Sequence, residues 1–277
     1  MSLKVTPAPI LFPGASSKTY ANVPALMGIP GTAGVPDRIR DAAHRLETYS
    51  PELGTDLENF PFTDYGNLIL PSIKIEENAR LVGDACRAII NTNAVPVFLA
   101  RDARFTASTI RATADRYPEL TVVQMGARAN LLEEFDGQKW HARTSMKRVL
   151  DHLSVTQLKN LGSRSGTKEE FDLIETGGTR LSVEDLPSLG KEGLYLNLDL
   201  SLFDPYTAPG VSHPEPGGMN WDEFSKIMAF IPWRRVKACD LVGLEPSGDH
   251  TGLSDLVAAK VLREIILLLA KTLAPQD

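Results

Sequence analysis

Short β-rich runs that alternate with helical patterns constrain this 277-residue chain more than any other feature. Between residues 75 and 89 the apolar side chains return every three or four positions, which predicts a helix with one buried face. Further helices are expected over 220–231 and 254–273. The expected strands are Ala25–Ile29, Val95–Leu99, Thr121–Met125, Leu194–Leu200 and Val236–Val242. Strands that alternate with helices favour an α/β fold, in which helices cover both faces of a mainly parallel sheet.

The remaining segments are expected to be connections within one domain. Leu53–Pro71 is rich in Pro, Gly, Asp and Asn, which indicates a long surface connection, and Gly162–Gly166 and Thr176–Arg180 indicate shorter ones. No shift in composition marks a boundary, so we expect a single domain over residues 1–277.

Charge and hydropathy exclude several classes of partner. The formal net charge of −6 offers no basic surface for nucleic acid or for an anionic membrane. The longest aliphatic run, Ile265–Ala270, is far shorter than a membrane span, and the first residues lack the pattern of a signal peptide. Cys86 and Cys239 lie in apolar segments and are expected to be buried thiols. We therefore expect a cytoplasmic protein.

Polar residues follow the predicted strands at the edge where parallel sheets bind ligands. Asp102, with an arginine on either side at 101 and 104, follows the second strand; Arg128 follows the third, Asp199 lies near the end of the fourth, and Glu245 follows the fifth. A carboxylate at the end of a buried strand needs a partner. These groups therefore form either a structural ion pair or a binding or catalytic site, and the pattern leaves both open.

One ordered series of motifs is more specific. The chain reads L-D-L-S-L-F-D-P over 198–205, A-P-G over 208–210 and P-E-P-G-G over 214–218. This series resembles the ureohydrolases, the family of arginase, agmatinase and formimidoylglutamase, whose motifs are S-x-D-x-D-x-x-D-P, A-P-G and P-E-P-G-G. Weaker matches occur in the family's order at 28–30, 64–67, 96–103, 122–131 and 240–249. The resemblance covers roughly residues 25 to 270.

The resemblance implies a three-layer αβα sandwich of the arginase type and a binuclear manganese site. In the family the two metals activate a hydroxide that attacks a guanidinium carbon. Of the six ligand positions, this chain keeps Asp199. The other five positions fall on Ala103, Gly126, Arg128, Asn130 and Ser201. The glutamate that grips the guanidinium falls on Gly243, and the family's H-G motif falls on His141–Ala142.

These replacements change the chemistry expected at the site. Alanine and glycine cannot ligate a metal, neutral Asn and Ser are weak ligands for manganese, and Arg128 brings a permanent positive charge. We therefore expect no metal cofactor and predict that Arg128 pairs directly with Asp199, Asp102 or both. A different metal site that uses His141 and His213 stays open, although no H-x-x-H or C-x-x-C spacing supports it. The pocket candidates are Asp102, Arg128, His141, Asp199, His213 and Glu245.

The expected function follows from a retained scaffold and a degenerate site. We expect a pseudoenzyme of the ureohydrolase fold that binds a small ligand or serves as a subunit. The resemblance makes a homo-oligomer, trimer or hexamer, or a hetero-oligomer with an active paralogue the expected assembly. The alternative is a hydrolase of amidine C–N bonds, of the arginase or agmatinase type, with an altered or relocated manganese site.

Overall fold

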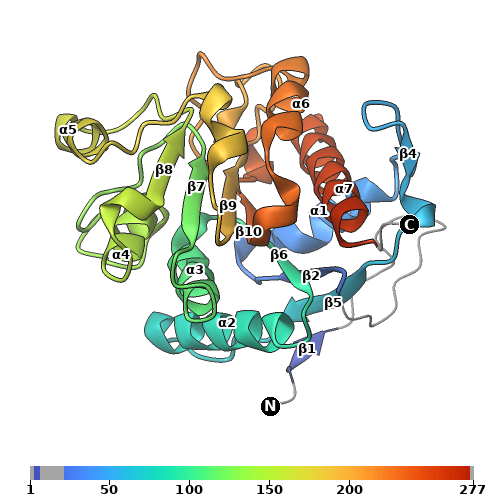
Figure 1. Cartoon of the computed structure of the whole chain (residues 1–277), viewed down its shortest axis with the longest axis horizontal. Helices are drawn as coiled ribbons and strands as arrows, with labels where there is room; N and C mark the ends of the chain where they lie inside the picture. The colour runs from blue at the N-terminus through green and yellow to red at the C-terminus, as the bar shows by residue number, and fades with distance from the viewer. Residues whose placement is uncertain (1–2, 7–21, 275–277) are drawn as a thin grey trace.

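A sheet of eight strands with helices on both faces forms the body of the molecule (Figure 1). The computed structural model describes residues 3–6 and 22–274. The strands are β1 Val5–Thr6, β2 Pro24–Gly28, β3 Tyr49–Ser50, β4 Thr55–Asp56, β5 Thr63–Leu68, β6 Val95–Leu99, β7 Thr121–Met125, β8 Leu158–Leu161, β9 Leu194–Asp199 and β10 Val236–Val242. The α-helices are α1 Val35–Ala43, α2 Ile75–Ile90, α3 Thr106–Ala114, α4 Ser145–Leu150, α5 Lys168–Thr176, α6 Trp221–Phe230 and α7 Leu253–Leu273.

The strand order of the large sheet is β1-β5-β2-β6-β10-β9-β7-β8. Every neighbouring pair is parallel except β1 and β5, which are antiparallel. The prediction of a mainly parallel sheet is confirmed. Because β6, β10, β9 and β7 are consecutive in the sheet, the loops that follow these four strands meet at one edge.

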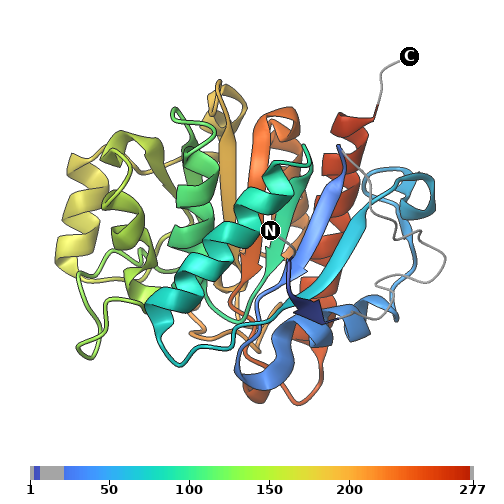
Figure 2. The same ribbon diagram turned by 90° about the horizontal axis from the view of Figure 1, so that it is seen from below.

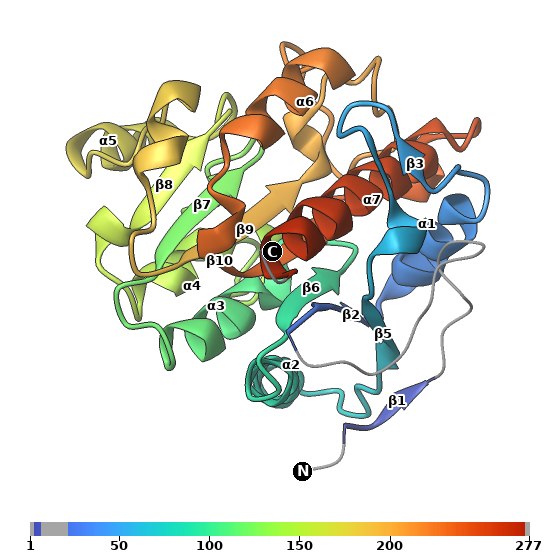
Figure 3. The same cartoon turned by 45° about the vertical axis from the view of Figure 1, so that its right-hand side comes forward.

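Helices cover both faces of this sheet, so the predicted three-layer αβα arrangement is confirmed. Helices α2, α3 and α4 lie on one face and α1, α6 and α7 on the other (Figure 2). Strand side chains alternate between the two layers: along β9, Leu196 and Leu198 join the core under α6 and α7, whereas Tyr195 joins the core under α3 and α4. Helix α7 runs alongside α1 (Figure 3). None of the helices in residues 3–6 and 22–274 is both long and apolar enough to span a membrane.

Most predicted elements lie within one or two residues of their positions in the structure. The strand expected over Ala25–Ile29 is β2, and the strand expected over Leu194–Leu200 ends at Asp199, where a 3-10 turn begins. The helices expected over 75–89, 220–231 and 254–273 are α2, α6 and α7. Cys86 and Cys239 are buried and free, and burial raises the pKa of the Cys86 thiol to about 12.

The prediction of a surface connection over Leu53–Pro71 is wrong. This segment contains β4 and β5, and β5 pairs with β2 inside the large sheet. Its polar residues hid the strand, because Thr63–Leu68 reads T-D-Y-G-N-L and lacks the apolar run of the central strands. The strand is stable because a buried arginine on α1 satisfies its polar groups.

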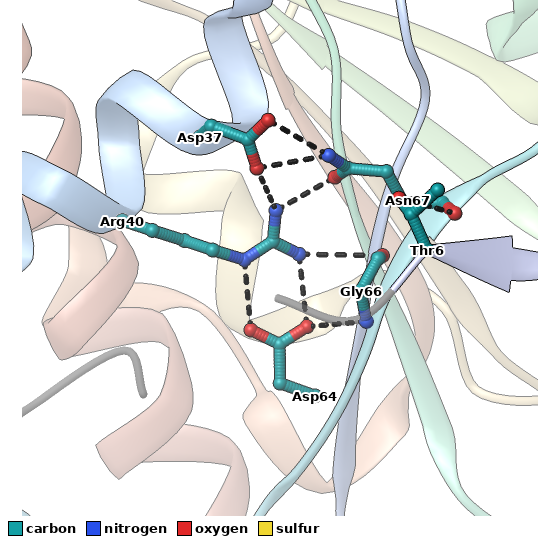
Figure 4. Close-up of polar contacts among 6 residues, drawn as sticks. All are labelled: Thr6, Asp37, Arg40, Asp64, Gly66 and Asn67. Atoms are coloured by element: carbon teal, nitrogen blue, oxygen red, sulfur yellow. Dashed lines mark hydrogen bonds and ion pairs between the residues drawn. The ribbon is translucent and has the colours of Figure 1, made fainter. Parts of the chain in front are cut away.

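That arginine is Arg40, whose side chain is fully buried (Figure 4). Its Nε and Nη2 donate to the two carboxylate oxygens of Asp64, each at 2.8 Å, and its Nη1 donates to Asn67 Oδ1 at 2.7 Å. Asp37 accepts from the Asn67 amide at 2.8 Å and lies 3.2 Å from Arg40. The carbonyl of Gly66 also accepts from Arg40. This network joins α1 to β5 near the edge of the sheet. Because the guanidinium of Arg40 is buried, it needs a carboxylate partner.

Candidate functional site

The carboxyl ends of β6, β10, β9 and β7 bring most of the predicted site residues to one cavity. The cavity has a volume of about 20 Å³. Asp102 and Ala103 come from the loop after β6, and Gly243 follows β10. The residues that line it are Asp102, Ala103, Arg128, Asn130, Ala142, Arg143, Asp199, Ser201, Ser212, His213 and Gly243. A space of this size holds about one water-sized group.

Asp199 at the end of β9 is turned toward its own backbone. Its Oδ1 accepts from the N–H of Ser201 at 2.8 Å, as the N-cap of the following 3-10 turn. The hydroxyl of Ser201 in turn accepts from the N–H of Ala127 at 3.1 Å. Burial raises the pKa of Asp199, and the N–H of Ser201 and the charge of Arg128 oppose that rise. The carboxylate therefore caps the strand end.

Two glycines allow Asp199 to take this position. Gly243 has a φ of +94°, a conformation that other residues rarely adopt, and a Cβ there would overlap Asp199 Oδ1. A Cβ at Gly126 would lie 3.0 Å from Asp199 Cβ. The Asp199 side chain therefore fills the space from which side chains at positions 126 and 243 would extend.

Arg128 lines the cavity without a carboxylate partner. Its Nε is buried and has no hydrogen-bond partner, and within the described part of the chain no carboxylate lies at ion-pair distance from its guanidinium. The predicted pair between Arg128 and Asp199 or Asp102 is wrong. The physical reason is competition: the backbone at Ser201 holds Asp199, and neighbouring arginines hold Asp102.

Asp102 and Glu245 belong to a separate group of ion pairs. Arg104 donates to both oxygens of Asp102, at 2.9 and 3.0 Å, and Arg101 lies 3.8 Å from the same carboxylate. Arg101 also contacts Glu245, whose pKa is lowered although burial opposes this, because Ser247 and Arg101 donate to it. Glu245 does not line the small cavity, because this pairing directs it toward Arg101.

A second, larger cavity adjoins this group of ion pairs. Its volume is about 200 Å³, and it shares Asp102 as a wall with the small cavity. Ile29, Pro30 and Phe105 form the apolar part of its wall, and Arg101, Asp102 and Arg104 form the charged part.

The two candidate histidines have different positions. His141 is the N-cap of the turn before α4: its Nδ1 accepts from the N–H of Arg143 at 3.1 Å, and its ring stacks on Phe135 at 4.5 Å. It does not line the small cavity. His213 does line it, and burial together with the charges of Arg128 and Arg143 lowers its pKa. His213 is therefore the neutral imidazole of the site at pH 7.

Sequence reasoning does not find Arg143 and Ser212, which complete the cavity wall. Arg143 lies far along the connection between β7 and α4, so no strand end points to it. Arg143 could have been found from its position directly after His141–Ala142, which matches the family's H-G motif. Its guanidinium lies 4.9 Å from the centre of the Phe135 ring, which holds it in place without a carboxylate.

Comparison with known proteins agrees with both the fold and the sequence motifs. The sequence profile described as "Arginase family" matches residues 25–268. The chain belongs to the arginase family. It is 28% identical to an agmatinase of Bacillus cereus over 248 residues, which cover 86% of each protein. It is 27% identical to the mitochondrial guanidino acid hydrolase of Rattus norvegicus over 262 residues, 87% of this chain and 74% of the relative. The structure of the agmatine ureohydrolase of Thermoplasma volcanium shares the fold, with a TM-score of 0.79, 24% identity and 90% of each chain covered.

The residues present at the arginase-family metal positions do not fit a manganese pair. Ala103 and Gly126 have no donor atom, Arg128 is a cation, and the Ser201 hydroxyl already accepts from Ala127. Asp199 supplies one carboxylate where two dications need several. In the segments 3–6 and 22–274, no group of three or more His, Cys, Asp or Glu side chains is arranged to share an ion.

The loop motifs of the arginase family are kept as scaffold. Asp204 Oδ2 accepts from the N–H groups of Gly217 and Gly218, at 2.8 and 3.2 Å. Arg164 donates to the carbonyls of Ser201 and Glu215, at 2.9 and 2.6 Å, and so joins this loop to the end of β9. These contacts hold the loop against the end of β9.

Proposed function

We propose that this arginase-family protein binds a small ligand in the remodelled cavity and does not hydrolyse guanidinium compounds through a manganese pair. The observation that carries this proposal is Arg128, a permanent cation at a former ligand position that lines the cavity, while no carboxylate of the described residues lies at ion-pair distance from its guanidinium. A dication at this position would be repelled by the guanidinium, and the single carboxylate of Asp199 could not offset two dications.

The same charges oppose a guanidinium substrate. Such a substrate is a cation, and in the family a glutamate grips it from the position that Gly243 occupies here. Arg128 and Arg143 line the cavity that the substrate would enter and would repel it. A metal ion lowers the pKa of bound water from about 15.7 to about 7, and a site without that ion has no comparable nucleophile at neutral pH.

The alternative function is hydrolysis of amidine C–N bonds with an altered or relocated manganese site. Its support is the 28% identity with an agmatinase over 86% of this chain. The donors available to such a site around the cavity are Asp102, Asp199 and His213.

Metal content and urea release test the two functions together. Protein produced in manganese-supplemented medium is expected to contain far less than one manganese ion per chain. With agmatine, arginine or guanidinobutyrate, urea release is expected at the level of the blank. Elemental analysis and a urea assay on the same sample measure both quantities.

The agmatinase of Bacillus cereus, prepared in the same medium, is the positive control. About two manganese ions per chain, or metal-dependent urea release that Asp199→Ala abolishes, would contradict the proposal and favour the hydrolase.

We also propose that the protein works in the cytoplasm as an oligomer, either a homotrimer or homohexamer, or together with an active paralogue. The motive is family membership. Light scattering at micromolar concentration is expected to give a mass that is a multiple of the 30.2 kDa chain. A monomeric mass, with no paralogue retained during purification, would refute both assemblies.

A further inference from the structure

Arg128 and Arg143 differ from the other arginines of this protein in the surroundings of their guanidinium groups. Most arginines contact a carboxylate or backbone carbonyls, as Arg40 and Arg164 do. The arginines without such a side-chain acceptor at 45, 111, 116 and 234 are exposed, so water solvates their charge. Within the part of the chain that the structure describes, Arg128 and Arg143 alone are partly buried and lack an anionic or carbonyl acceptor for the guanidinium.

Both of these arginines line the same small cavity. Burial and the charge of Arg143 lower the pKa of Arg128, although the carboxylates of Glu215, Asp199 and Glu170 oppose this, so the two guanidinium groups repel each other. Arginine stays protonated in proteins, so the site cannot relieve this repulsion by losing a proton. A bound anion would relieve it, since charge-assisted hydrogen bonds to guanidinium are strong and can be bidentate.

We propose that the cavity between Arg128 and Arg143 binds the carboxylate of a small organic acid whose apolar part extends into the neighbouring cavity beside Phe105. This proposal rests on the proposed function, because a manganese pair would require anionic ligands where these cations stand. One oxygen of the carboxylate occupies the space of about 20 Å³, and the rest of the acid occupies the space of about 200 Å³ that shares Asp102 as its wall.

The size and charge of the walls select a carboxylate over a phosphate. The small cavity admits one water-sized group, which suits an oxygen of a planar carboxylate better than a tetrahedral dianion. Asp102 and Asp199 also line it beside the two arginines, and their repulsion is stronger for a dianion than for a monoanion. The side-chain amide of Asn130 and the hydroxyl of Ser212 are neutral polar groups in the wall that can donate to a carboxylate. His213, whose pKa is lowered, adds no competing positive charge.

Isothermal titration with acetate, propionate and butyrate at constant ionic strength tests this site. Each acid is expected to bind one per chain, with affinity that rises from acetate to butyrate as the alkyl chain covers Ile29, Pro30 and Phe105. Arg128→Gln and Arg143→Gln are each expected to weaken binding at least tenfold, because each removes a charge-assisted contact. Arg111→Gln, which removes an exposed arginine that lines neither cavity, is the matched control and is expected to bind as the wild type does.

Stability without ligand gives an independent measurement. Arg128→Gln removes a partly buried charge that has no ion-pair partner and that Arg143 repels, so the ligand-free variant is expected to melt close to or above the temperature of the wild type while it loses the stabilisation by butyrate. Absence of binding by the three acids, or binding that Arg128→Gln leaves unchanged, would overturn the proposal. Tighter Arg128-dependent binding of inorganic phosphate would overturn the choice of carboxylate. The manganese assay decides the proposed function separately, since a metal-free protein that ignores these acids contradicts this inference alone.

Discussion

Asp64→Ala is expected to lower the free energy of unfolding by about 3–5 kcal/mol, because it leaves the buried guanidinium of Arg40 without its carboxylate. The side chains of Arg40 and Asp64 are 0% and 4% exposed, so water cannot replace the lost contact. Asn67 and Asp37 stay near Arg40, but the Asp37 side chain is 51% exposed and touches Arg40 at 3.2 Å only. At about 2–4 °C per kcal/mol, the melting temperature should fall by roughly 10 °C.

Two variants separate the uncompensated charge from the loss of packing. Arg40→Met combined with Asp64→Leu removes both charges and is expected to recover part of the stability that Asp64→Ala loses. Asp115→Ala breaks an exposed pair with Arg87, with side chains 54% and 41% exposed, and should change stability by less than about 1 kcal/mol. If denaturant unfolding gives Asp64→Ala the same small effect as Asp115→Ala, the Arg40 network does not hold β5 in the sheet.

Asp240→Asn is expected to change how stability depends on pH. Asp240 lies on β10 with its carboxylate buried, and burial raises its pKa to about 6, although Thr106 and Asn197 donate to it at 2.6 and 2.7 Å. The pKa in the unfolded chain is about 3.9, so the folded protein holds the extra proton between these two values. The stability contributed by this group is complete below about pH 4 and is lost as the pH rises through about 6.

The asparagine variant does not titrate. Its stability relative to the wild type should therefore increase by up to about 3 kcal/mol between pH 4 and pH 7, since one pKa unit corresponds to about 1.4 kcal/mol. The hydroxyl of Thr106 can turn to accept from the new amide, so the packing is preserved. Carboxylates whose pKa is lowered in the folded protein, such as those of Glu52 and Asp249, make stability increase with pH. Their contribution is the same in the wild type and in the variant, so it cancels when the two stabilities are subtracted.

Chemical denaturation at several pH values measures this difference. Asp172→Asn, at a surface position with a side chain 58% exposed, is the control and should differ from the wild type by less than about 1 kcal/mol. A difference between Asp240→Asn and the wild type that is flat from pH 4 to pH 7 would show that Asp240 titrates alike in the folded and unfolded chains.

The sequence alone is sufficient to predict the central strands and the residues that lie at the carboxyl-end edge of the sheet. The runs that became β6, β7 and β10 are mostly apolar, and a strand buried on both faces favours that pattern. The carboxyl ends of parallel strands meet at one edge, so Asp102, Arg128 and Asp199 could be assigned to one cavity before any coordinates were known. The order of the motifs also shows which residues fall on the positions that hold metal ligands in the family.

The partner of each charged side chain was decided by tertiary structure. Strand β5 is polar, and it is a strand because Arg40, distant in sequence, lies where it can bind Asp64. Asp199 was predicted to pair with Arg128, but it caps the N–H of Ser201 in the space left by Gly126 and Gly243. The physical reason is how far along the chain each feature is determined. The burial pattern of a strand or helix is determined by a few consecutive residues. The choice between competing hydrogen-bond donors depends instead on distances of tenths of an ångström between segments that are far apart in the sequence.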